Sequence, residues 1–267
     1  MVRALLLTLV LALPAWGWEI TIAFTTDLHA TLPLFPALAP ILAQADLVLD
    51  GGDAWEDLTR LTGPGEAEAA MRWMGELGYD AMVLGNHEMY LGPKLRRLIE
   101  GAPFAVVVTN LDGLPVRRWA LFEVRGVRVL VLGILGEEYP WSLWREVRLS
   151  DPVESVRTAL AAAPAHDTLV LVGHMDLSLA KQVATAVPEC SLFVLGHNHR
   201  FLTEPIWVGA IPIVQAGHRG QAVGVAKLTE EGLASYELIR HPSPAALPAL
   251  WLPAALILLL LILWPKG

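Results

Sequence analysis

Residues 20–29 read ITIAFTTDLH, in which a strand-like apolar run ends in an aspartate and a histidine two residues apart. Four later segments repeat this pattern, each with an acid, an amide or an imidazole beside a glycine at the end of a run that reads as a buried strand. They are Gly51-Gly52-Asp53, Gly85-Asn86-His87-Glu88, Gly173-His174 and Gly196-His197-Asn198-His199, after runs at 47–49, 81–84, 169–172 and 192–195. Ligands of an open α/β sheet lie beyond the carboxyl ends of its strands, so we expect the five loops to converge on one crevice.

Strand-like and helical segments alternate between residues 19 and 240, which predicts a layered α/β domain. The spacing of apolar residues predicts helices at 34–44, 66–77, 152–163 and 178–187. A hairpin is expected at 119–124 and 127–132, and late strands at 211–214, 222–228 and 235–239. Together these segments predict a two-sheet sandwich with helices outside and its loops gathered at one edge.

Composition excludes some classes of partner. The 267 residues carry a formal net charge of −8 and no basic tract, so we expect no nucleic-acid partner. Hydrophobic residues make up 54% of the chain, and the excess is concentrated at the two ends. The single cysteine, Cys190, precedes an apolar strand and is expected to be a buried small side chain.

The first 17 residues have the pattern of a secretory signal peptide. A basic start at Arg3 precedes an apolar run at 4–13 and small residues at Ala15 and Gly17. We expect cleavage after Gly17; the alternative is a buried strand or helix of the fold. The catalytic domain is then residues 18–240, exported to the periplasm or the cell surface.

The last residues have the pattern of a membrane anchor. Residues 247–264 contain no charge, and about 18 residues in a helix reach ~27 Å, enough to cross a hydrocarbon core. Trp251 and Trp264 lie near its ends and Lys266 follows, which is typical of an anchor in the cytoplasmic membrane. Residues 241–246 read as a short linker. The alternative is an apolar helix packed on the domain.

The five loops offer donors for metal ions. Asp27 and His29, like His197 and His199, are two residues apart, and in extended backbone such side chains point the same way. The loops contain no thiolate, so the donor set suits Mn, Fe, Zn, Co or Mg. Two aspartates, two divalent ions and one hydroxide leave a charge of about +1, which favours a phosphate-bearing substrate. A pair of metals about 3.5–4 Å apart can generate the hydroxide and stabilise both ends of an in-line displacement.

The chain resembles the calcineurin-like metallophosphoesterase superfamily over residues 19–228, and within it the 5′-nucleotidase/UDP-sugar hydrolase branch. The branch is suggested by Gly-Gly-Asp at 51–53, Gly-Asn-His-Glu at 85–88 and the late turn at 215–224. The resemblance implies a four-layer α-β-β-α sandwich with a dinuclear metal site. It assigns Asp27, His29 and His199 to one metal, Asn86, His174 and His197 to the other, Asp53 to a bridge between them, and His87 to catalysis.

The sequence departs from the family pattern at three points. Ala30 stands where the family usually has glycine, and Tyr90 stands where the branch often has an aspartate that orients the catalytic histidine. Glu88, Asp57 and the Tyr90 hydroxyl are the candidates to replace that aspartate. The branch usually has a C-terminal domain that stacks the nucleobase, and we expect none after residue 240. Nucleoside recognition would then come from loops, with Trp141 and Trp144 as candidate walls or as packing.

The sequence therefore predicts a hydrolase that cleaves small phosphate esters, most simply nucleotides, with a hydroxide bridging two divalent cations. Arg200 and Arg219 lie beside the motifs and either contact the phosphate or are solvated. One alternative is a phosphodiesterase acting on cyclic nucleotides or lipid head groups. A second is a catalytically weak binding or scaffold protein. The membrane is the expected partner of the C-terminal helix, and the sequence does not indicate which protein partners the chain has.

Overall fold

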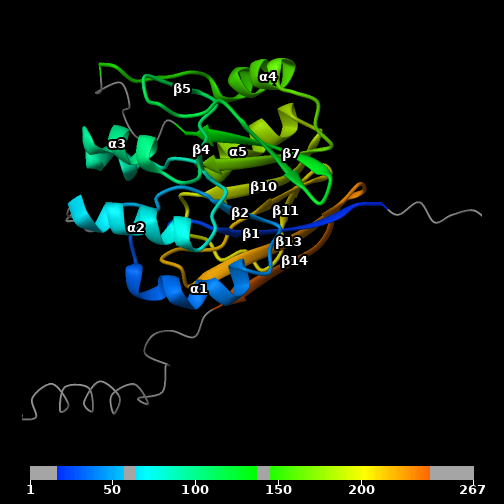
Figure 1. Cartoon of the computed structure of the whole chain (residues 1–267). Coiled ribbons are helices and arrows are strands. Elements are labelled where there is room, and N and C mark those ends of the chain that lie inside the picture. Colours follow the sequence, from blue (N-terminus) through cyan, green and yellow to red (C-terminus); the bar gives the residue numbers. More distant parts are fainter. Residues whose placement is uncertain (1–16, 57–63, 137–144, 241–267) are drawn as a thin grey trace, which may run out of the picture.

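The computed structural model describes residues 17–56, 64–136 and 145–240. In this part of the chain two six-stranded sheets pack face to face, with helices on both outer sides (Figure 1). The predicted four-layer α/β sandwich is therefore confirmed.

The first sheet has the strand order β14-β13-β1-β2-β3-β4. Its strands are β1 (Glu19–Thr25), β2 (Leu47–Asp50), β3 (Ala81–Met82), β4 (Ala105–Val106), β13 (Ala222–Thr229) and β14 (Gly232–Arg240). Strands β1 to β4 run parallel, whereas β13 is antiparallel to both β1 and β14. It follows that β14 runs in the same direction as β1.

The second sheet has the order β11-β12-β10-β9-β7-β6. Its strands are β6 (Ala120–Val124), β7 (Val127–Leu135), β9 (Thr168–His174), β10 (Cys190–Gly196), β11 (Ile206–Val208) and β12 (Ile211–Val214). Along β7, Val129 and Val131 join the core between the sheets, while Leu130 and Leu132 pack with the outer helices. This alternation follows from the two-residue period of a strand. A small third sheet pairs β5 (Leu111–Asp112) with β8 (Arg148–Leu149).

Helices cover the outside of each sheet. The helices α1 (Phe35–Leu42), α2 (Pro64–Glu76) and α3 (Lys94–Gly101) share the first core cluster, and short 3-10 turns lie at Leu32–Leu34 and Glu88–Leu91. The helices α4 (Pro152–Ala162) and α5 (Leu177–Ala186) pack on the second sheet (Figure 1). Helix α4 begins as its sequence predicts, because Pro152 is its first residue and the Asp151 side chain accepts the Glu154 amide at 2.8 Å.

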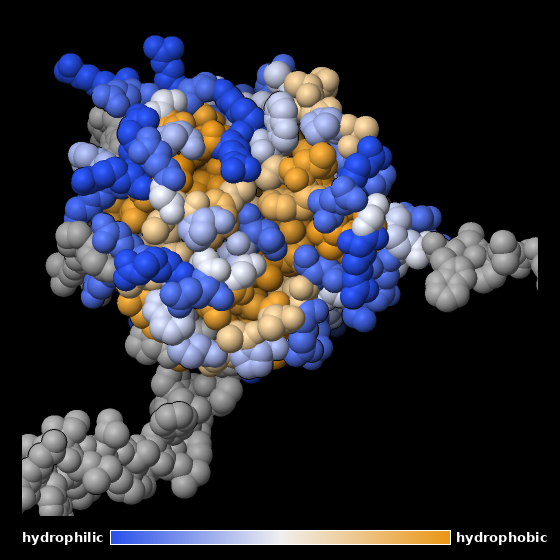
Figure 2. Space-filling model, viewed as in Figure 1, coloured by the Kyte–Doolittle hydropathy of each residue, from blue (hydrophilic) through white to orange (hydrophobic). Residues whose placement is uncertain are grey.

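Most expected elements are confirmed, with boundary shifts of a few residues. The helix predicted at 34–44 shortens to α1, which contains Pro40. Helix α3 and the strands β4, β5, β8 and β11 were not expected from the pattern. Cys190 is buried as predicted. Seen from one side, the molecule has hydrophilic residues around its rim, with hydrophobic residues showing between them (Figure 2).

The predicted signal peptide at 1–17 lies almost wholly outside the described residues, and so do the linker and the anchor after residue 240. Among the residues that the structure describes, no helix is long and apolar enough to span a membrane.

Candidate metal centre

The five loops meet at one edge of the sandwich and are tied together by hydrogen bonds. The Asp27 amide donates to the Gly52 carbonyl at 3.0 Å, and the His197 amide donates to Asp27 Oδ1 at 2.9 Å. The His87 amide donates to Asp53 Oδ1 at 2.7 Å. The convergence predicted from the strand ends is therefore confirmed.

The carboxylates and imidazoles of these loops form three overlapping groups of possible metal ligands. Within each group the ligand atoms lie within 4.8 Å of one another. The groups are Asp27-His29-His199, Asp27-Asp53-His174 and His29-Asp53-His87. Asp27, His29 and Asp53 each belong to two of these groups, so the three groups form one connected cluster.

Asn86 and His197 join the same cluster through their side chains. Asn86 Oδ1 lies 3.1 Å from His174 Nε2 and 3.0 Å from His197 Nδ1, and His174 Nε2 is 3.1 Å from Asp53 Oδ2. All seven side chains that the resemblance assigns to metals are therefore gathered in one place. Their assignment to individual ions stays a prediction.

The chemistry of this donor set fits divalent cations. Asp27 Oδ2 is buried and has no hydrogen-bond partner among the described residues, which leaves an acceptor in need of a cation. His29 Nε2 and His199 Nε2 face each other at 3.1 Å, so at least one of these nitrogens carries no proton. Oxygen and imidazole donors without thiolate are the ligands of Mn, Fe, Zn, Co and Mg sites.

Burial sets the protonation of the imidazoles. Burial lowers the pKa of His29 to about 3 and that of His199 to about 4, so both rings are neutral near pH 7 and keep a lone pair for a metal. Burial raises the pKa of Asp27 to about 7. Burial also disfavours the charged form of His174, but the Asp53 carboxylate outweighs it and raises the pKa of His174 to about 10. Without a cation, His174 is therefore the group that compensates the Asp53 charge.

The backbone at five of the donors is not extended, which corrects one expectation. Asp27 and His29 have φ of +54° and +48°, and Asp53, His197 and His199 also lie in the left-handed region. The reason given for Asp27 and His29 sharing an ion, the two-residue period of a strand, is therefore wrong, because the strand ends at Thr25. Hydrogen bonds between loops hold these residues in a conformation that costs roughly 1–3 kcal/mol each. Ala30, with φ of +49°, occupies a position that suits the glycine usual in the family.

Two glycines of the motifs lie so close to donor side chains that no residue with a Cβ atom would fit there. At Gly85, an added Cβ would collide with the Asp53 carboxylate. At Gly52, with φ of +89°, it would lie 2.7 Å from His174 Nδ1. Gly52 and Gly85 are thus parts of the centre, because any side chain there would displace a donor.

Glu56 contacts His87 and was not predicted from the sequence. Its Oε2 lies 2.6 Å from His87 Nδ1, and its side chain is buried. Burial favours the neutral imidazole, but the Glu56 carboxylate and the nearby Asp53 raise the pKa of His87 above its ordinary value. The position three residues after Asp53, within the same loop, is the only sequence signal for it.

Three residues were named from the sequence as candidates to orient His87, and the structure describes two of them. Glu88 is buried and accepts the amides of Asp53, Trp55 and Gly85 at 3.0, 2.9 and 2.6 Å, so it fixes two of the loops instead. The Tyr90 ring meets the His87 ring edge-on at 5.5 Å. Asp57 lies outside the described residues.

Replacing Glu56 tests its part in positioning His87. We expect Glu56→Gln to keep the bound metal and to lower kcat by about 10–100-fold, the usual effect of removing a partner that orients a site residue. The 15N chemical shifts of His87 should show a changed tautomer balance, and Glu56→Asp should recover part of kcat. Glu123→Gln, on an exposed position of β6, serves as the matched control. An unchanged tautomer and kcat, or loss of metal, would contradict the positioning role.

Arg219 and Arg200, the two residues predicted to contact phosphate, differ in how they lie beside the metal donors. The Arg219 amide donates to the Asp27 carbonyl at 2.7 Å, and its Nε is buried without a hydrogen-bond partner among the described residues. Arg200 follows His199 directly and is exposed. His218, which the sequence did not single out, stacks on the His199 ring with centroids 4.7 Å apart. Arg219 and His218 therefore border the donors, whereas the Arg200 side chain is exposed to solvent.

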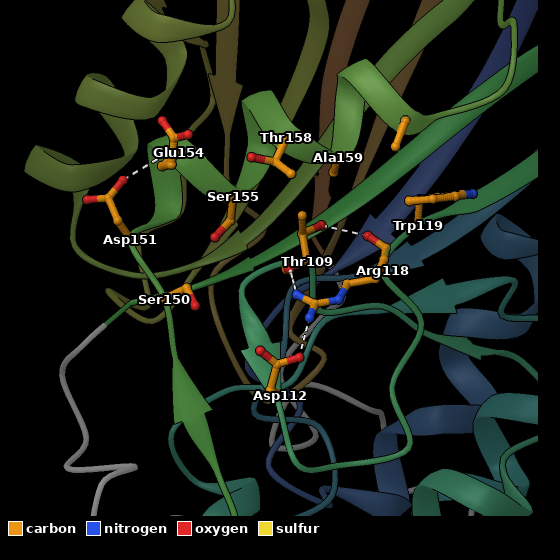
Figure 3. A pocket seen from close by; sticks show the side chains of 11 residues that line it. Thr109, Asp112, Arg118, Trp119, Ser150, Asp151, Glu154, Ser155, Thr158 and Ala159 are labelled. Atoms are coloured by element: carbon orange, nitrogen blue, oxygen red, sulfur yellow. Dashed lines mark hydrogen bonds and ion pairs between the residues drawn. The ribbon is translucent and has the colours of Figure 1, made fainter.

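A cavity of about 480 Å³ lies between α4 and the segment from Thr109 to Trp119 (Figure 3). None of the site residues predicted from the sequence lines it. Arg118 is the cation among its described lining residues, and its guanidinium already binds the Thr109 carbonyl and the Asp112 carboxylate. Asp151 and Glu154 add negative charge there. This cavity is therefore poorly suited to a phosphate.

Comparison with known proteins decides the family. The model of the calcineurin-like phosphoesterase family matches residues 20–201, well over half of the chain. The chain belongs to the calcineurin-like phosphoesterase family. Members of this family are hydrolases that use divalent metals, and the donors described above lie within or beside the matched region.

Several similar proteins align with most of this chain. The uncharacterized metallophosphoesterase YunD of Bacillus subtilis is 26% identical over 78% of this chain and 50% of its own length. The 5′-nucleotidase of Rattus norvegicus is 26% identical over 84% of this chain and 47% of its own. The solved 5′-nucleotidase precursor of Thermus thermophilus shares the fold, with a TM-score of 0.65, 24% identity and coverage of 92% of this chain and 59% of that one. The chain thus spans about half the length of the curated relatives it matches.

Proposed function

We propose that this member of the family hydrolyses phosphate monoesters with two divalent cations, and that nucleotides are among its substrates. The observation that carries the proposal is the meeting of seven acid, amide and imidazole side chains at the strand ends, among them Asp53, which belongs to two of the three donor groups. We divide the set as the resemblance implies. Asp27, His29 and His199 would hold one cation, Asn86, His174 and His197 the other, and Asp53 both.

Two cations bound there would neutralise the charge of the phosphate and make the attacking water more acidic. The chain's own residues would orient the ester and supply the proton that the leaving oxygen takes up. His87, with Nδ1 fixed by Glu56, would donate a proton from Nε2 to the leaving oxygen. Arg219, beside Asp27, is placed to bind a phosphate oxygen through its guanidinium.

Nucleotides are proposed because several relatives carry the name 5′-nucleotidase. An anionic ester would also suit the centre, because two bound divalent cations would supply four positive charges against two aspartates. Diesters, including cyclic nucleotides, are the competing substrate class.

A substrate panel tests the proposal. The purified chain, stripped with chelator and reloaded with Mn, Zn, Co, Fe or Mg, should hydrolyse p-nitrophenyl phosphate and a nucleoside monophosphate. It should hydrolyse bis(p-nitrophenyl) phosphate more slowly, and the chelated protein should hydrolyse none of these esters. Faster turnover of the bis ester would replace the monoesterase assignment with a diesterase. Absence of hydrolysis with every metal would contradict the proposal.

We also propose that residues 1–17 direct export and that residues 247–264 anchor the domain in the cytoplasmic membrane, with the catalytic domain outside. The apolar, uncharged character of residues 247–264 supports the anchor.

A further inference from the structure

Strand β14 brings the chain out of the domain at the edge that carries the metal donors. Arg240, the last residue of β14, pairs with Ala222, and Gly224 pairs with Phe24 of β1. Continuing this register places Ala222 opposite Thr26, the residue before Asp27. Two spacings between neighbouring strands separate β14 from β1, so the end of β14 lies about 10 Å from this part of the centre.

Side-chain contacts connect the end of β14 to a metal donor. The Arg240 guanidinium lies over the Phe201 ring, 4.5 Å from its centroid. Phe201 meets His218 edge-on at 5.8 Å, and His218 stacks on His199. The point where the chain leaves the domain is therefore packed against the wall of the candidate site.

The sequence after Arg240 limits how far the domain can move from its anchor. Residues 241–246 read HPSPAA, and six residues span at most about 20 Å. The uncharged run at 247–264 follows directly. An anchor formed by this run would hold the donor edge near the membrane surface. The opposite edge would be held away from it by the length of β13, roughly 27 Å for its eight residues.

The charges on the two ends of this hairpin agree with that orientation. Arg240 lies over the Phe201 ring, Arg200 precedes Phe201 in the chain and Arg219 follows His218. None of the three arginines is in an ion pair among the described residues. The turn at the other end of the β13–β14 hairpin carries the exposed Glu230 and Glu231. Anionic head groups attract the arginine end and repel the glutamate end.

We propose that the donor edge faces the bilayer and that the centre also hydrolyses phosphate monoesters carried on membrane lipids. This inference rests on the proposed function and on the proposed anchor. A lipid held in the bilayer presents its phosphate within the short reach of the linker, so its effective concentration at the centre exceeds that of the same phosphate in solution.

Fluorescence energy transfer tests the orientation without using activity. The full chain is inserted into vesicles of phosphatidylglycerol and phosphatidylcholine that contain an acceptor lipid, with a donor dye on Gln221→Cys or on Glu231→Cys. Both positions are exposed, one at each end of β13, and the native Cys190 is buried. We expect clearly stronger transfer from position 221. Equal transfer, stronger transfer from 231, or a chain that does not remain with the vesicles would overturn the orientation.

Hydrolysis in the same vesicles tests the substrate class. Phosphatidic acid in the bilayer should be cleaved with a kcat/KM at least about 10-fold above that for soluble glycerol phosphate. Inserting about 20 Gly and Ser residues between Arg240 and His241 should reduce this advantage and leave p-nitrophenyl phosphate hydrolysis unchanged. Cleavage of p-nitrophenyl phosphate without cleavage of the lipid would overturn this inference alone. Failure on p-nitrophenyl phosphate with every metal would contradict the proposed function, and the transfer experiment would still decide the orientation.

Discussion

Asp53→Asn is expected to remove most of the bound metal and to lower kcat/KM by about 10³-fold or more, at least ~4 kcal/mol in activation free energy. The Asp53 carboxylate reaches two of the three donor groups and lies 3.1 Å from His174 Nε2. Asparagine keeps the size of the side chain and can still accept the His87 amide, so the loop should keep its shape. What the variant loses is the negative charge among the donors.

Metal content by elemental analysis and turnover of p-nitrophenyl phosphate measure this effect. Asp167→Asn is the matched control, because Asp167 pairs with Arg128 at the surface, before β9, away from the donors. It should leave both quantities unchanged. An Asp53→Asn protein with full metal content and normal kcat/KM would contradict a central ligand role for Asp53.

The sequence predicted the donors because their positions depend on a simple rule. Each apolar run is long enough to be a buried strand, and the polar residues at 27, 53, 86, 174 and 197 follow the ends of such runs within four residues. Parallel strands end at the same edge, so placing the strands also places the loops. No knowledge of the side-chain conformations was needed for that step.

The conformation of the loops could not be predicted in the same way. A donor pair such as Asp27 and His29 reaches one group of ligand atoms through left-handed backbone, which local propensity disfavours for both residues. The hydrogen bonds that impose it come from other loops, for example from the His29 amide to the Asp53 carbonyl at 2.8 Å. Such strain is determined by tertiary structure, and the residue pattern within one loop does not show it.

Glu56 escaped prediction for a related reason. The family pattern directs attention to the position three residues after His87, which is Tyr90 here. The carboxylate that contacts His87 comes instead from the loop after β2, more than 30 residues earlier in the chain. Any loop that packs beside His87 could supply this carboxylate. Which loop supplies it is therefore determined by how the loops pack together in the folded protein.

The geometry leaves two roles open for His87, and one substitution separates them. His87 belongs to a donor group with His29 and Asp53, so it is near enough to be a ligand. Its Nδ1 is engaged by Glu56, which leaves Nε2 for a proton or a metal. A ligand would be needed for metal binding, whereas a proton donor would be needed only for turnover.

We expect His87→Ala to retain its metals and to lower turnover by ~10²–10⁴-fold, the usual range for lost proton transfer. The loss should depend on the leaving group. p-Nitrophenolate leaves readily without a proton, so its ester should lose less than a nucleoside monophosphate, whose alkoxide needs one. His166→Ala, at an imidazole that contacts the Pro164 carbonyl outside the site, is the control. Loss of metal from His87→Ala would make His87 a ligand, and equal losses on both esters would exclude its role as the proton donor.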